Sequence, residues 1–251
     1  MTDLRGKVAL ITGSARGIGQ AIALRYAALG ANIVVNYTRD DAAARTTVSA
    51  VEARGAEAIA VRCDVSAIAD LDALFRAGLE RFGRLDIVVA NAGVEIVNQP
   101  IAEVTEEQFD RLFAINTKGA FFTMQKAAQH IADEGRILYI GSTTTHGAFP
   151  GAGLYGCSKM APQYLVDVLA MEVGARNITV NSIEATAIDG AGVFTESGAN
   201  NPLRQQIAAT RPIENRLGTP DDVADAAEYF ASPLARWVSG QHLLITGGAT
   251  Q

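Results

Sequence analysis

Tyr155 and Lys159 stand four residues apart in a run of helical periodicity, and together they could perform acid/base chemistry. Residues four apart share one face of a helix, so the two side chains are neighbours. A free tyrosine ionises near pH ~10, but a desolvated ammonium group one turn away stabilises the phenolate. The pair therefore predicts a general acid/base that works near neutral pH. Because Tyr-x-x-x-Lys is common by chance, the prediction depends on where this helix lies.

A glycine-rich segment joins the first apolar run, 8–11, to the helical run that follows it. Its glycines have the spacing G-x-x-x-G-x-G rather than the more usual G-x-G-x-x-G. Glycines allow a tight turn and let a pyrophosphate approach the backbone at a helix N-terminus. We therefore expect a dinucleotide to bind here, and a tight turn without a ligand is the alternative. The expected contacts are Gly13, Ser14, Arg16, Gly17, Ile18 and Gly19.

The segment after the second apolar run, 33–35, bears on the choice of dinucleotide. NAD enzymes usually place an acid at this strand end to bind the ribose, and here none occurs before Asp40. Arg39 lies there instead, and Arg16 lies in the glycine loop. Charge-assisted bonds to a 2′-phosphate would contribute about 1.5–3 kcal/mol each. We predict NADP(H) rather than NAD(H), bound at this end by Tyr37, Thr38 and Arg39; two solvated surface arginines are the alternative.

Two further strand ends carry small or polar residues. Asp64 and Val65 follow the third apolar run, and Asn91, Ala92 and Gly93 end the fourth. The carboxyl ends of parallel strands meet at one edge of a sheet, where a dinucleotide lies in doubly wound folds. We expect Asp64 to hydrogen-bond the adenine amino group and the other residues to border the same crevice.

Short apolar runs alternate with longer helical runs along the whole chain. Apolar runs lie at 8–11, 33–35, 58–61, 85–89, 137–140, 178–183 and 242–245. Thr105, Thr219 and Ser66 are expected to cap helices over 105–130, 219–231 and 66–79. Strands that are apolar throughout are buried on both faces. The pattern predicts one α/β domain over 1–251, a Rossmann-type doubly wound parallel sheet of seven strands, with 185–210 as a substrate-binding lid.

The composition excludes several classes of function. The 251 residues carry a formal net charge of -6 and no Lys/Arg cluster, which argues against a nucleic-acid ligand. Cys63 and Cys157 form no disulfide framework or metal-type spacing, and we expect both as small core residues. The sequence has no apolar stretch of 18 residues and no signal-peptide core. We therefore expect a cytoplasmic protein without a membrane span.

In this order and at this spacing, the motifs closely resemble those of the classical short-chain dehydrogenase/reductase family over essentially the whole chain. They are the glycine loop, Asp64, Asn91-Ala92-Gly93, Asn116, Ser142 and Tyr155-Gly156-Cys157-Ser158-Lys159. The resemblance implies a Rossmann fold that binds NAD(P), a homotetramer and a catalytic tetrad. The tetrad is Asn116, Ser142, Tyr155 and Lys159.

The resemblance also implies a role for each member of the tetrad. Tyr155 passes a proton to or from the substrate oxygen, and Ser142 hydrogen-bonds that oxygen. Lys159 holds the nicotinamide ribose and lowers the pKa of Tyr155, and Asn116 supports a water that extends the proton relay. The alternatives are a plain loop hydroxyl for Ser142 and a backbone-bonding helix residue for Asn116.

The chain departs from the family after the sixth apolar run. Family members usually have a Pro-Gly pair there, whereas this sequence has Ala185-Thr186. Thr186 lacks the freedom of glycine at positive φ. By the resemblance, the backbone contact to the nicotinamide carboxamide falls on Ile188.

These features predict an NADP(H)-dependent reductase that interconverts a small or cyclic ketone and its secondary alcohol. A 3-oxoacyl-carrier-protein reductase is the first alternative, but the segment 129–134 lacks the basic patch that an acidic carrier protein needs. A non-catalytic dinucleotide-binding regulator is the second. Such a protein would need neither Tyr155 nor Ser142.

Overall fold

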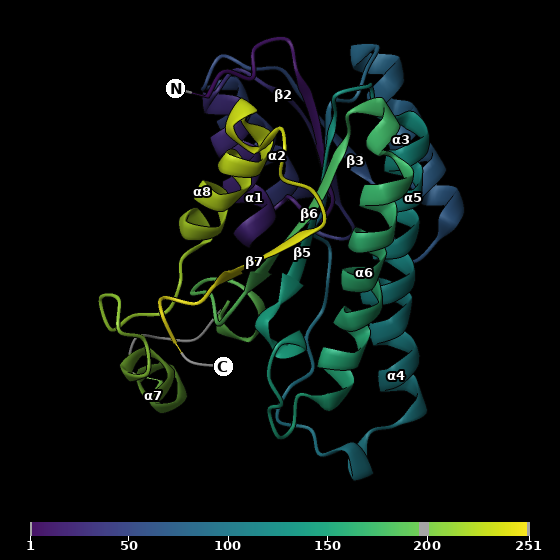
Figure 1. The fold of residues 1–251 in the computed structure, drawn as a ribbon. Coiled ribbons are helices and arrows are strands. Elements are labelled where there is room, and N and C mark those ends of the chain that lie inside the picture. The colour runs from purple at the N-terminus through teal and green to yellow at the C-terminus, as the bar shows by residue number, and fades with distance from the viewer. Residues whose placement is uncertain (1, 196–200, 250–251) are drawn as a thin grey trace.

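The computed structural model describes residues 2–195 and 201–249, and these form a seven-stranded parallel sheet between two layers of helices (Figure 1). The strands are β1 Val8–Ile11, β2 Asn32–Tyr37, β3 Ala58–Arg62, β4 Ile87–Ala90, β5 Arg136–Ser142, β6 Thr179–Ala185 and β7 Gln241–Ile245. Their order across the sheet is β3-β2-β1-β4-β5-β6-β7. The predicted doubly wound Rossmann-type architecture in a single domain is confirmed.

The helices divide between the two faces of the sheet. They are α1 Gly17–Ala28, α2 Asp41–Glu52, α3 Ile68–Phe82, α4 Glu106–Leu112, α5 Ala120–His130, α6 Gly153–Glu172, α7 Pro202–Ala209 and α8 Pro220–Ala231. Helices α1, α2 and α8 cover one face, and α3, α5 and α6 cover the other (Figure 1).

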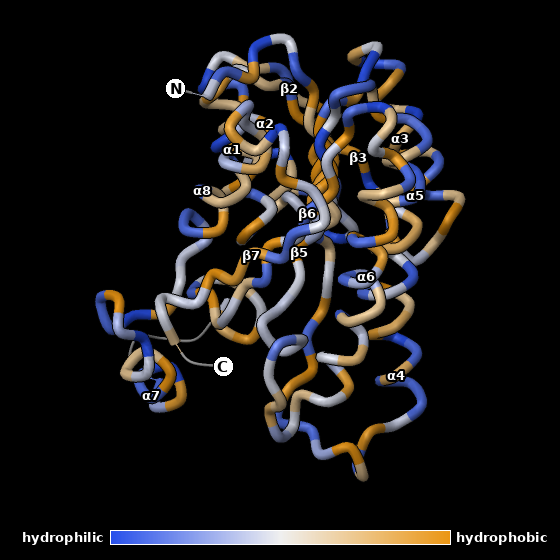
Figure 2. Tube along the Cα trace, in the orientation of Figure 1, coloured by the Kyte–Doolittle hydropathy of each residue, from blue (hydrophilic) through white to orange (hydrophobic). Residues whose placement is uncertain are grey.

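Each face of the sheet has its own hydrophobic core. Ile22, Tyr26 and Phe230 pack on the α1/α8 face, whereas Phe75 and Met124 pack on the α3/α5 face. The apolar strands form the orange centre of Figure 2. Burial on both faces explains why the strands lack a polar alternation.

The strand order reverses between β1 and β4, which are neighbours in the sheet although β2 and β3 lie between them in sequence. Connections from these two strands run to opposite faces, so a crevice opens at their carboxyl ends. The glycine loop follows β1, and Asn91 follows β4. The topology thus brings both predicted cofactor segments to one edge.

The helix predicted over 105–130 is continuous but not uniform. Thr105 and Gln108 form the predicted capping box at its start. Between α4 and α5 lies a π-helical segment, Phe113–Gly119, with Asn116 fully buried at its middle. Helical periodicity in the sequence does not distinguish this wider turn from an α-helix.

Two local expectations, for Ser66 and Cys157, were wrong. Ser66 does not cap α3: the cap residue is Ala67, without a side-chain bond, and the Ser66 hydroxyl instead donates to Asp64 Oδ1 at 2.7 Å. The predicted lid contains a helix, α7, whose first turn is capped by Asn201. Cys157 is exposed, because the sheet covers only one face of α6, while Cys63 is buried as expected. No helix among residues 2–195 and 201–249 is long and apolar enough to cross a membrane.

Candidate active site

The glycine loop keeps side chains away from the start of α1. Gly13 and Gly17 have φ angles of +64° and +57°, which residues with a Cβ rarely adopt. At Gly19 an added Cβ would lie 2.6 Å from Asn91 Nδ2 and equally close to the Gly13 carbonyl oxygen. The bare backbone at the helix N-terminus fits the binding of a pyrophosphate.

Asn36 on β2, which was not predicted from the sequence, holds the glycine loop in place. Its side-chain oxygen accepts a hydrogen bond from Gly13 N at 2.9 Å, and its Nδ2 donates to Cys63 O at 3.1 Å. The Asn36 backbone joins Ser14 through two further bonds, Ser14 N to Asn36 O at 2.9 Å and Asn36 N to Ser14 Oγ at 3.1 Å. Asn36 and Ser14 are buried, so they position the loop rather than face solvent.

Thr12 ties the ends of β1 and β4 together. Its hydroxyl oxygen accepts hydrogen bonds from Asn91 N at 2.9 Å and Ala92 N at 3.0 Å. Asn91 Nδ2 returns a bond to Thr12 O at 2.8 Å and one to Gly13 O at 3.2 Å. The two predicted cofactor segments are therefore locked to each other, as the topology requires.

The carboxylates nearest to the end of β2 already have partners. Asp40 accepts from Ala43 N and caps α2, and Asp41 binds the Tyr37 hydroxyl at 2.6 Å and pairs with Arg45. Arg39 and Arg16 are exposed, and neither guanidinium group makes a hydrogen bond or ion pair with any other described residue. Their free guanidinium groups fit the 2′-phosphate of NADP(H). Asp40 and Asp41 already have partners, so they are poorly placed to bind the ribose hydroxyls of NAD(H).

Asp64 and Val65 follow β3 at the same edge. Asp64 is exposed, and its Oδ1 accepts hydrogen bonds from Ser66 N at 3.0 Å and from the Ser66 hydroxyl. Val65 is buried against Gly119, where an added Cβ would come within 2.8 Å of its side chain. The β3 end is therefore packed against the π-helical segment that holds Asn116.

Ser142, Tyr155 and Lys159 come together at the carboxyl end of β5. Ser142 is buried and hydrogen-bonds Tyr155, while its hydroxyl oxygen accepts from Thr144 Oγ1 at 3.0 Å. Lys159 Nζ donates to Ile140 O at 3.0 Å and lies 5.9 Å from the centre of the Tyr155 ring. The predicted catalytic side chains thus share one site.

The two titratable groups of this site are strongly perturbed. Burial raises the pKa of Tyr155 above its ordinary value, the Glu95 carboxylate adds to this, and the hydrogen bond from Ser142 opposes it. Burial lowers the pKa of Lys159 to about 8, against the attraction of Glu184 and Glu95. In the chain alone, the pKa of Tyr155 is therefore raised rather than lowered. A protonated tyrosine is the form that can donate a proton.

Asn116 is held by three hydrogen bonds. Its Oδ1 accepts from Val94 N at 2.8 Å, and its Nδ2 donates to Val94 O at 2.8 Å and to Ser158 Oγ at 3.0 Å. Ser158 in turn donates to the Tyr155 carbonyl at 2.7 Å. The carboxamide of Asn116 thus aligns the end of β4 with α6. Because the carboxamide is fully used, a water of the predicted proton relay would have to bond the Asn116 backbone.

A proline inside α6 supplies a further link that the sequence analysis missed. Pro162 has no N–H, so the helix leaves the carbonyl of Ser158, four residues earlier, without its usual partner. The Thr117 hydroxyl of the π-helical segment donates to that carbonyl at 2.8 Å. Asn116 and Thr117 therefore both bond to Ser158, and α6 is fixed against the π-helical segment.

The segment after β6 closes over this edge. Ile188 is buried and pairs with Gly218, and Thr186, in place of the family's glycine, has an ordinary negative φ. Val193 N donates to the Glu95 carboxylate at 3.0 Å. Asp189 pairs with Arg204 of α7. The predicted lid is thus bound to the loop after β4 at one point and to its own helix at another.

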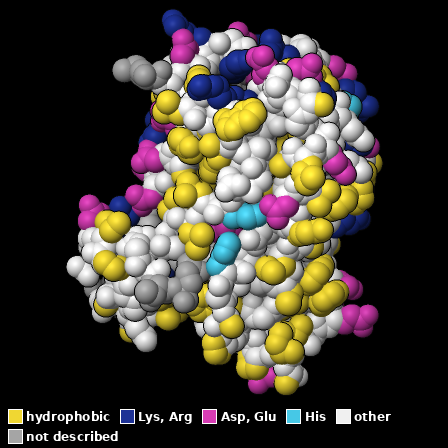
Figure 3. Space-filling view, viewed as in Figure 1, with side chains coloured by type: hydrophobic (Ala, Val, Ile, Leu, Met, Phe, Trp, Pro, Cys, Tyr) yellow, Lys and Arg dark blue, Asp and Glu magenta, His cyan; other side chains and the backbone are white. Residues whose placement is uncertain are grey.

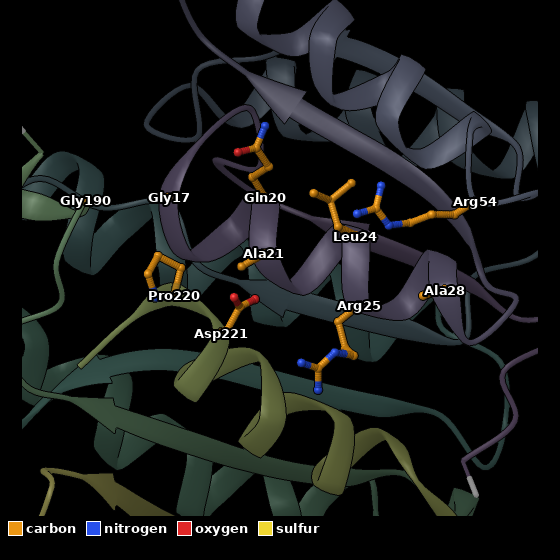
Figure 4. Close-up of a pocket in the computed structure, with 10 residues that line it drawn as sticks. All are labelled: Gly17, Gln20, Ala21, Leu24, Arg25, Ala28, Arg54, Gly190, Pro220 and Asp221. Atoms are coloured by element: carbon orange, nitrogen blue, oxygen red, sulfur yellow. The ribbon is translucent and has the colours of Figure 1, made fainter. Parts of the chain in front are cut away.

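A groove on the outer side of α1 lies next to the glycine loop, as Figure 4 shows. Gly17 and Gly190 meet at one end of it, where a Cβ on Gly17 would lie 3.6 Å from Gly190 O. Arg25 on the groove's other side pairs with Asp225 and Glu228 of α8. No residue of the tetrad lines this groove. The groove is relevant to the site only because the lid meets the glycine loop at its end.

Comparisons with known proteins agree with this geometry. Residues 13–250 match the family model described as enoyl-(acyl carrier protein) reductase. The hydroxynaphthalene reductase-like protein Arp2 of Metarhizium acridum is 37% identical over 98% of this chain and 96% of its own length. A mutant short-chain dehydrogenase/reductase of Serratia marcescens superposes with a TM-score of 0.91 at 34% identity, covering 98% of this chain and 99% of the other.

The angucycline C-6 ketoreductase LanV, solved with bound NADP, superposes with a TM-score of 0.90 at 35% identity, covering 98% of this chain and 96% of the other. The match to the family model spans nearly the whole chain, and the relatives share its length. The chain therefore belongs to the short-chain dehydrogenase/reductase family and is an NAD(P)-dependent oxidoreductase.

Proposed function

We propose that this oxidoreductase is an NADP(H)-dependent ketoreductase that converts a cyclic ketone into its secondary alcohol. The observation that carries the proposal is the convergence of Ser142, Tyr155 and Lys159 at the end of β5, with the pKa of Tyr155 raised. A tyrosine that stays protonated is a proton donor, which suits reduction. The reductase names of the relatives support the same direction.

In this proposal each residue of the tetrad has one task. Ser142 donates a hydrogen bond to the substrate oxygen, and Tyr155 delivers its proton to that oxygen. Lys159, whose Nζ lies 5.9 Å from the centre of the Tyr155 ring, supplies the positive charge that stabilises the Tyr155 phenolate. Asn116 keeps the loop after β4 and α6 in register through Val94 and Ser158.

The cofactor proposal rests on the glycine loop and the two free arginines. When bound, NADPH supplies the hydride for the substrate carbon. The residues that would hold it are the glycine loop, Arg16 and Tyr37 to Arg39 at the phosphate end, Asp64 and Val65 at the adenine, and Asn91 to Gly93, Lys159 and Ile188 towards the nicotinamide.

Cofactor choice can be tested by one charge reversal with a matched control. Arg39→Asp should lower the ratio of NADPH to NADH turnover by about ten- to a hundredfold, as the loss of one charge-assisted bond implies. Arg54→Asp makes the same charge change beyond the other end of α2, where the Arg54 side chain bonds Ala50 O, and should leave the ratio unchanged. An unchanged ratio in Arg39→Asp would overturn the NADP(H) assignment.

The substrate proposal can be tested by NADPH oxidation over a ketone panel. The panel should include bicyclic aryl ketones, simple cyclic ketones, small diketones and a 3-oxoacyl thioester on a carrier protein. We expect turnover of the cyclic ketones and its loss in Tyr155→Phe. Preference for the carrier-bound thioester would favour the first alternative function. Cofactor binding without any turnover would favour a regulator.

We also propose that the chain assembles as a homotetramer. Exposed apolar side chains on α4 to α6 support self-association; they include Phe109, Phe121, Met160, Tyr164 and Met171. Light scattering coupled to size exclusion should give a mass about four times the 26.4 kDa of one chain. The cytoplasmic location and the lid function of 185–210 stay predictions.

A further inference from the structure

Thr186, where the chain departs from the family, has a side-chain partner in a distant segment. Its hydroxyl oxygen accepts a hydrogen bond from Arg211 Nη2 at 2.6 Å. A glycine at this position has no side chain and could not make that bond. Thr186 directly follows β6, and Arg211 lies two residues after the end of α7. The substitution therefore joins the end of β6 to the segment after α7.

This pair lies next to the catalytic edge of the sheet. Ala185, the last residue of β6, is the register partner of Ser142 at the end of β5. Neighbouring strands lie ~4.8 Å apart and successive Cα atoms ~3.8 Å apart, so the Cα atoms of Thr186 and Ser142 are within about 9 Å of each other. Thr186 N also donates to Ile245 O, at the end of β7, at 3.3 Å. The Arg211 guanidinium group therefore lies by the ends of β6 and β7, beside the strand that carries Ser142.

Arg211 differs from the neighbouring arginines because it makes no ion pair with any described residue. Arg204 pairs with Asp189, and Arg216 pairs with Asp222. The difference affects ionisation: burial lowers the pKa of Arg211, whereas the hydrogen bond to Asp222 raises the pKa of Arg216. The charge of Arg211 is thus partly buried and has only a neutral hydroxyl as its side-chain partner.

The guanidinium group of Arg211 has unused hydrogen-bonding capacity. Its Nε is buried and has no partner among the described residues. Its Nη1 also makes no bond to a described residue, but this nitrogen is not buried and can be reached from outside. Removing such a group from water without a counter-charge costs free energy. An anion at Nη1 would supply both an acceptor and the opposite charge, and the Thr186 hydroxyl still has its own proton to donate.

The Arg211 side chain is held in place by the segment after β7. An added Cβ on Gly247 would lie 3.6 Å from Arg211 Cβ and 3.9 Å from its Cδ, so the backbone at Gly247 packs along the arginine stem. Ile213 N donates to Gly247 O at 3.1 Å and fixes this contact. Because the stem is already packed, an anion would bind with little further loss of side-chain entropy.

Other charged groups around β6 and β7 are directed elsewhere. Glu184 on β6 is fully buried and lies 3.9 Å from His242 Nδ1, and no described hydrogen bond or ion pair joins it to Arg211. His242 Nε2 lies 3.0 Å from Asp167 Oδ1. Figure 3 shows two histidine side chains together on this face of the molecule, beside a carboxylate. These contacts leave the positive charge of Arg211 uncompensated among the described residues.

We propose that Arg211 and Thr186 bind a carboxylate group of the ketone substrate. This inference rests on the proposed ketone reduction, and it narrows the substrate class to cyclic ketones that carry a carboxylate. Arg211 supplies the charge and the Nη1 donor, and Thr186 orients the guanidinium group and donates its hydroxyl proton. The reacting carbonyl meets Ser142 and Tyr155, so the substrate extends from the end of β5 towards the ends of β6 and β7.

A phosphate of the cofactor would offer the same anionic chemistry, but its expected position differs. The proposed phosphate contacts lie at the glycine loop after β1 and at the end of β2. In the sheet order, β4 and β5 separate these strands from β6 and β7. The place of Arg211 in the fold therefore favours an anion on the substrate.

Matched ketones test the proposal directly. The probes are tetralones with a carboxylate at each aromatic ring position in turn, the methyl ester of each, and the unsubstituted tetralone. We expect the parent to prefer at least one carboxylate to its ester by about ten- to a hundredfold in kcat/KM, mainly through KM, as a charge-assisted bond implies. Arg211→Met keeps the apolar stem but removes the charge, and it should bring this ratio to about one.

Further variants separate anion binding from damage to the fold. Thr186→Val keeps the side-chain shape without the hydroxyl and should lower the carboxylate-to-ester ratio about tenfold, whereas Thr186→Ser should keep most of it. Arg211→Lys keeps the charge without the planar fork and should give an intermediate ratio. Arg54→Met removes the same charge at a distant surface site and should keep the parental ratio. Structural damage would change the rates for acid and ester together and leave their ratio unchanged.

The outcomes are distinguishable. If the parent reduces ketones but prefers no carboxylate, only the anion site fails. If the parent reduces no tetralone, the proposed function fails, and calorimetric binding of the carboxylate and its ester to the NADP-loaded protein then tests the anion site alone by the same ratio.

Two controls complete the test. NADPH titrations without substrate identify the source of the anion: weaker NADPH binding in Arg211→Met with a parental carboxylate-to-ester ratio would mean a cofactor phosphate and overturn the proposal. If Arg211→Met does not fold, Thr186→Val decides, because a parental ratio there also overturns it.

Discussion

Replacing Lys159 by methionine should abolish reduction and yet make the folded chain more stable. Lys159 is 4% exposed, and burial lowers its pKa from 10.5 to about 8. A folded state that depresses the pKa of a lysine disfavours its charged form. The catalytic ammonium group therefore costs folding free energy at neutral pH, and a neutral side chain of similar length removes that cost.

The magnitude follows from the shift. A difference of about 2.5 units corresponds to about 3 kcal/mol at pH 7, where both the folded and unfolded lysine are protonated. Lys159→Met also leaves the Ile140 carbonyl without its bond from Nζ, which costs about 1 kcal/mol. We therefore expect a net gain of about 2 kcal/mol.

The sign of the pH dependence is fixed by linkage. Between pH 8 and 10.5 the unfolded lysine stays protonated while the folded one is neutral, so parental stability rises with pH in this window. The advantage of Lys159→Met is complete below about pH 8. It fades towards pH 10.5, where the loss of the Ile140 bond remains.

Urea unfolding of parent and variant without cofactor, at pH 7 and pH 10, measures this difference. Lys118→Met, which removes an exposed lysine, serves as the control and should shift stability by less than about 0.5 kcal/mol at either pH. A Lys159→Met variant that is less stable than the parent at pH 7 would refute the reasoning, as would a gain that is the same at both pH values.

Three shorter predictions follow from single contacts. Gly93→Ala should lower kcat about tenfold, because the new Cβ would lie 3.2 Å from Lys159 Nζ and must displace it. Steady-state measurement of kcat and of the KM for the ketone at several pH values tests this. Thr219→Ala removes the capping box of α8 and should lower the free energy of unfolding by about 1 kcal/mol in urea titrations. Asn36→Ala leaves Gly13 N without its acceptor and should weaken NADPH binding in fluorescence titrations, besides costing about 1–3 kcal/mol of stability.

The features that could be predicted from the sequence are those set by neighbours along the chain. The capping boxes at Thr105 and Thr219, the glycine loop and the apolar strands each depend on a few consecutive residues. The doubly wound parallel sheet followed because an alternation of buried strands and helices admits few topologies. The tetrad followed from the resemblance to the short-chain dehydrogenase/reductase family.

The features that were missed depend on pairing between distant segments. Asn36 reaches the glycine loop only because β2 lies beside β1, and Glu184 reaches the site only because β6 pairs with β5. Pro162 looks unfavourable in a helix until Thr117 is found to satisfy the carbonyl that it frees. Ser66 has two possible partners in sequence, the helix start and Asp64, and local spacing does not decide between them. For Asn36 and Glu184 the missing information was the register between strands.

The π-helical segment Phe113–Gly119 restricts how the length of this chain can change. Its wider turn places Asn116 between Val94 and Ser158 while α4 and α5 remain in their own packing positions. Deleting one residue here would restore the ordinary helical period and leave α4 and α5 in place, because the wider turn accommodates one extra residue. Without the wider turn, Asn116 would lose its position between Val94 and Ser158. Natural insertions and deletions in descendants of this sequence should therefore fall in the loops and spare this helix.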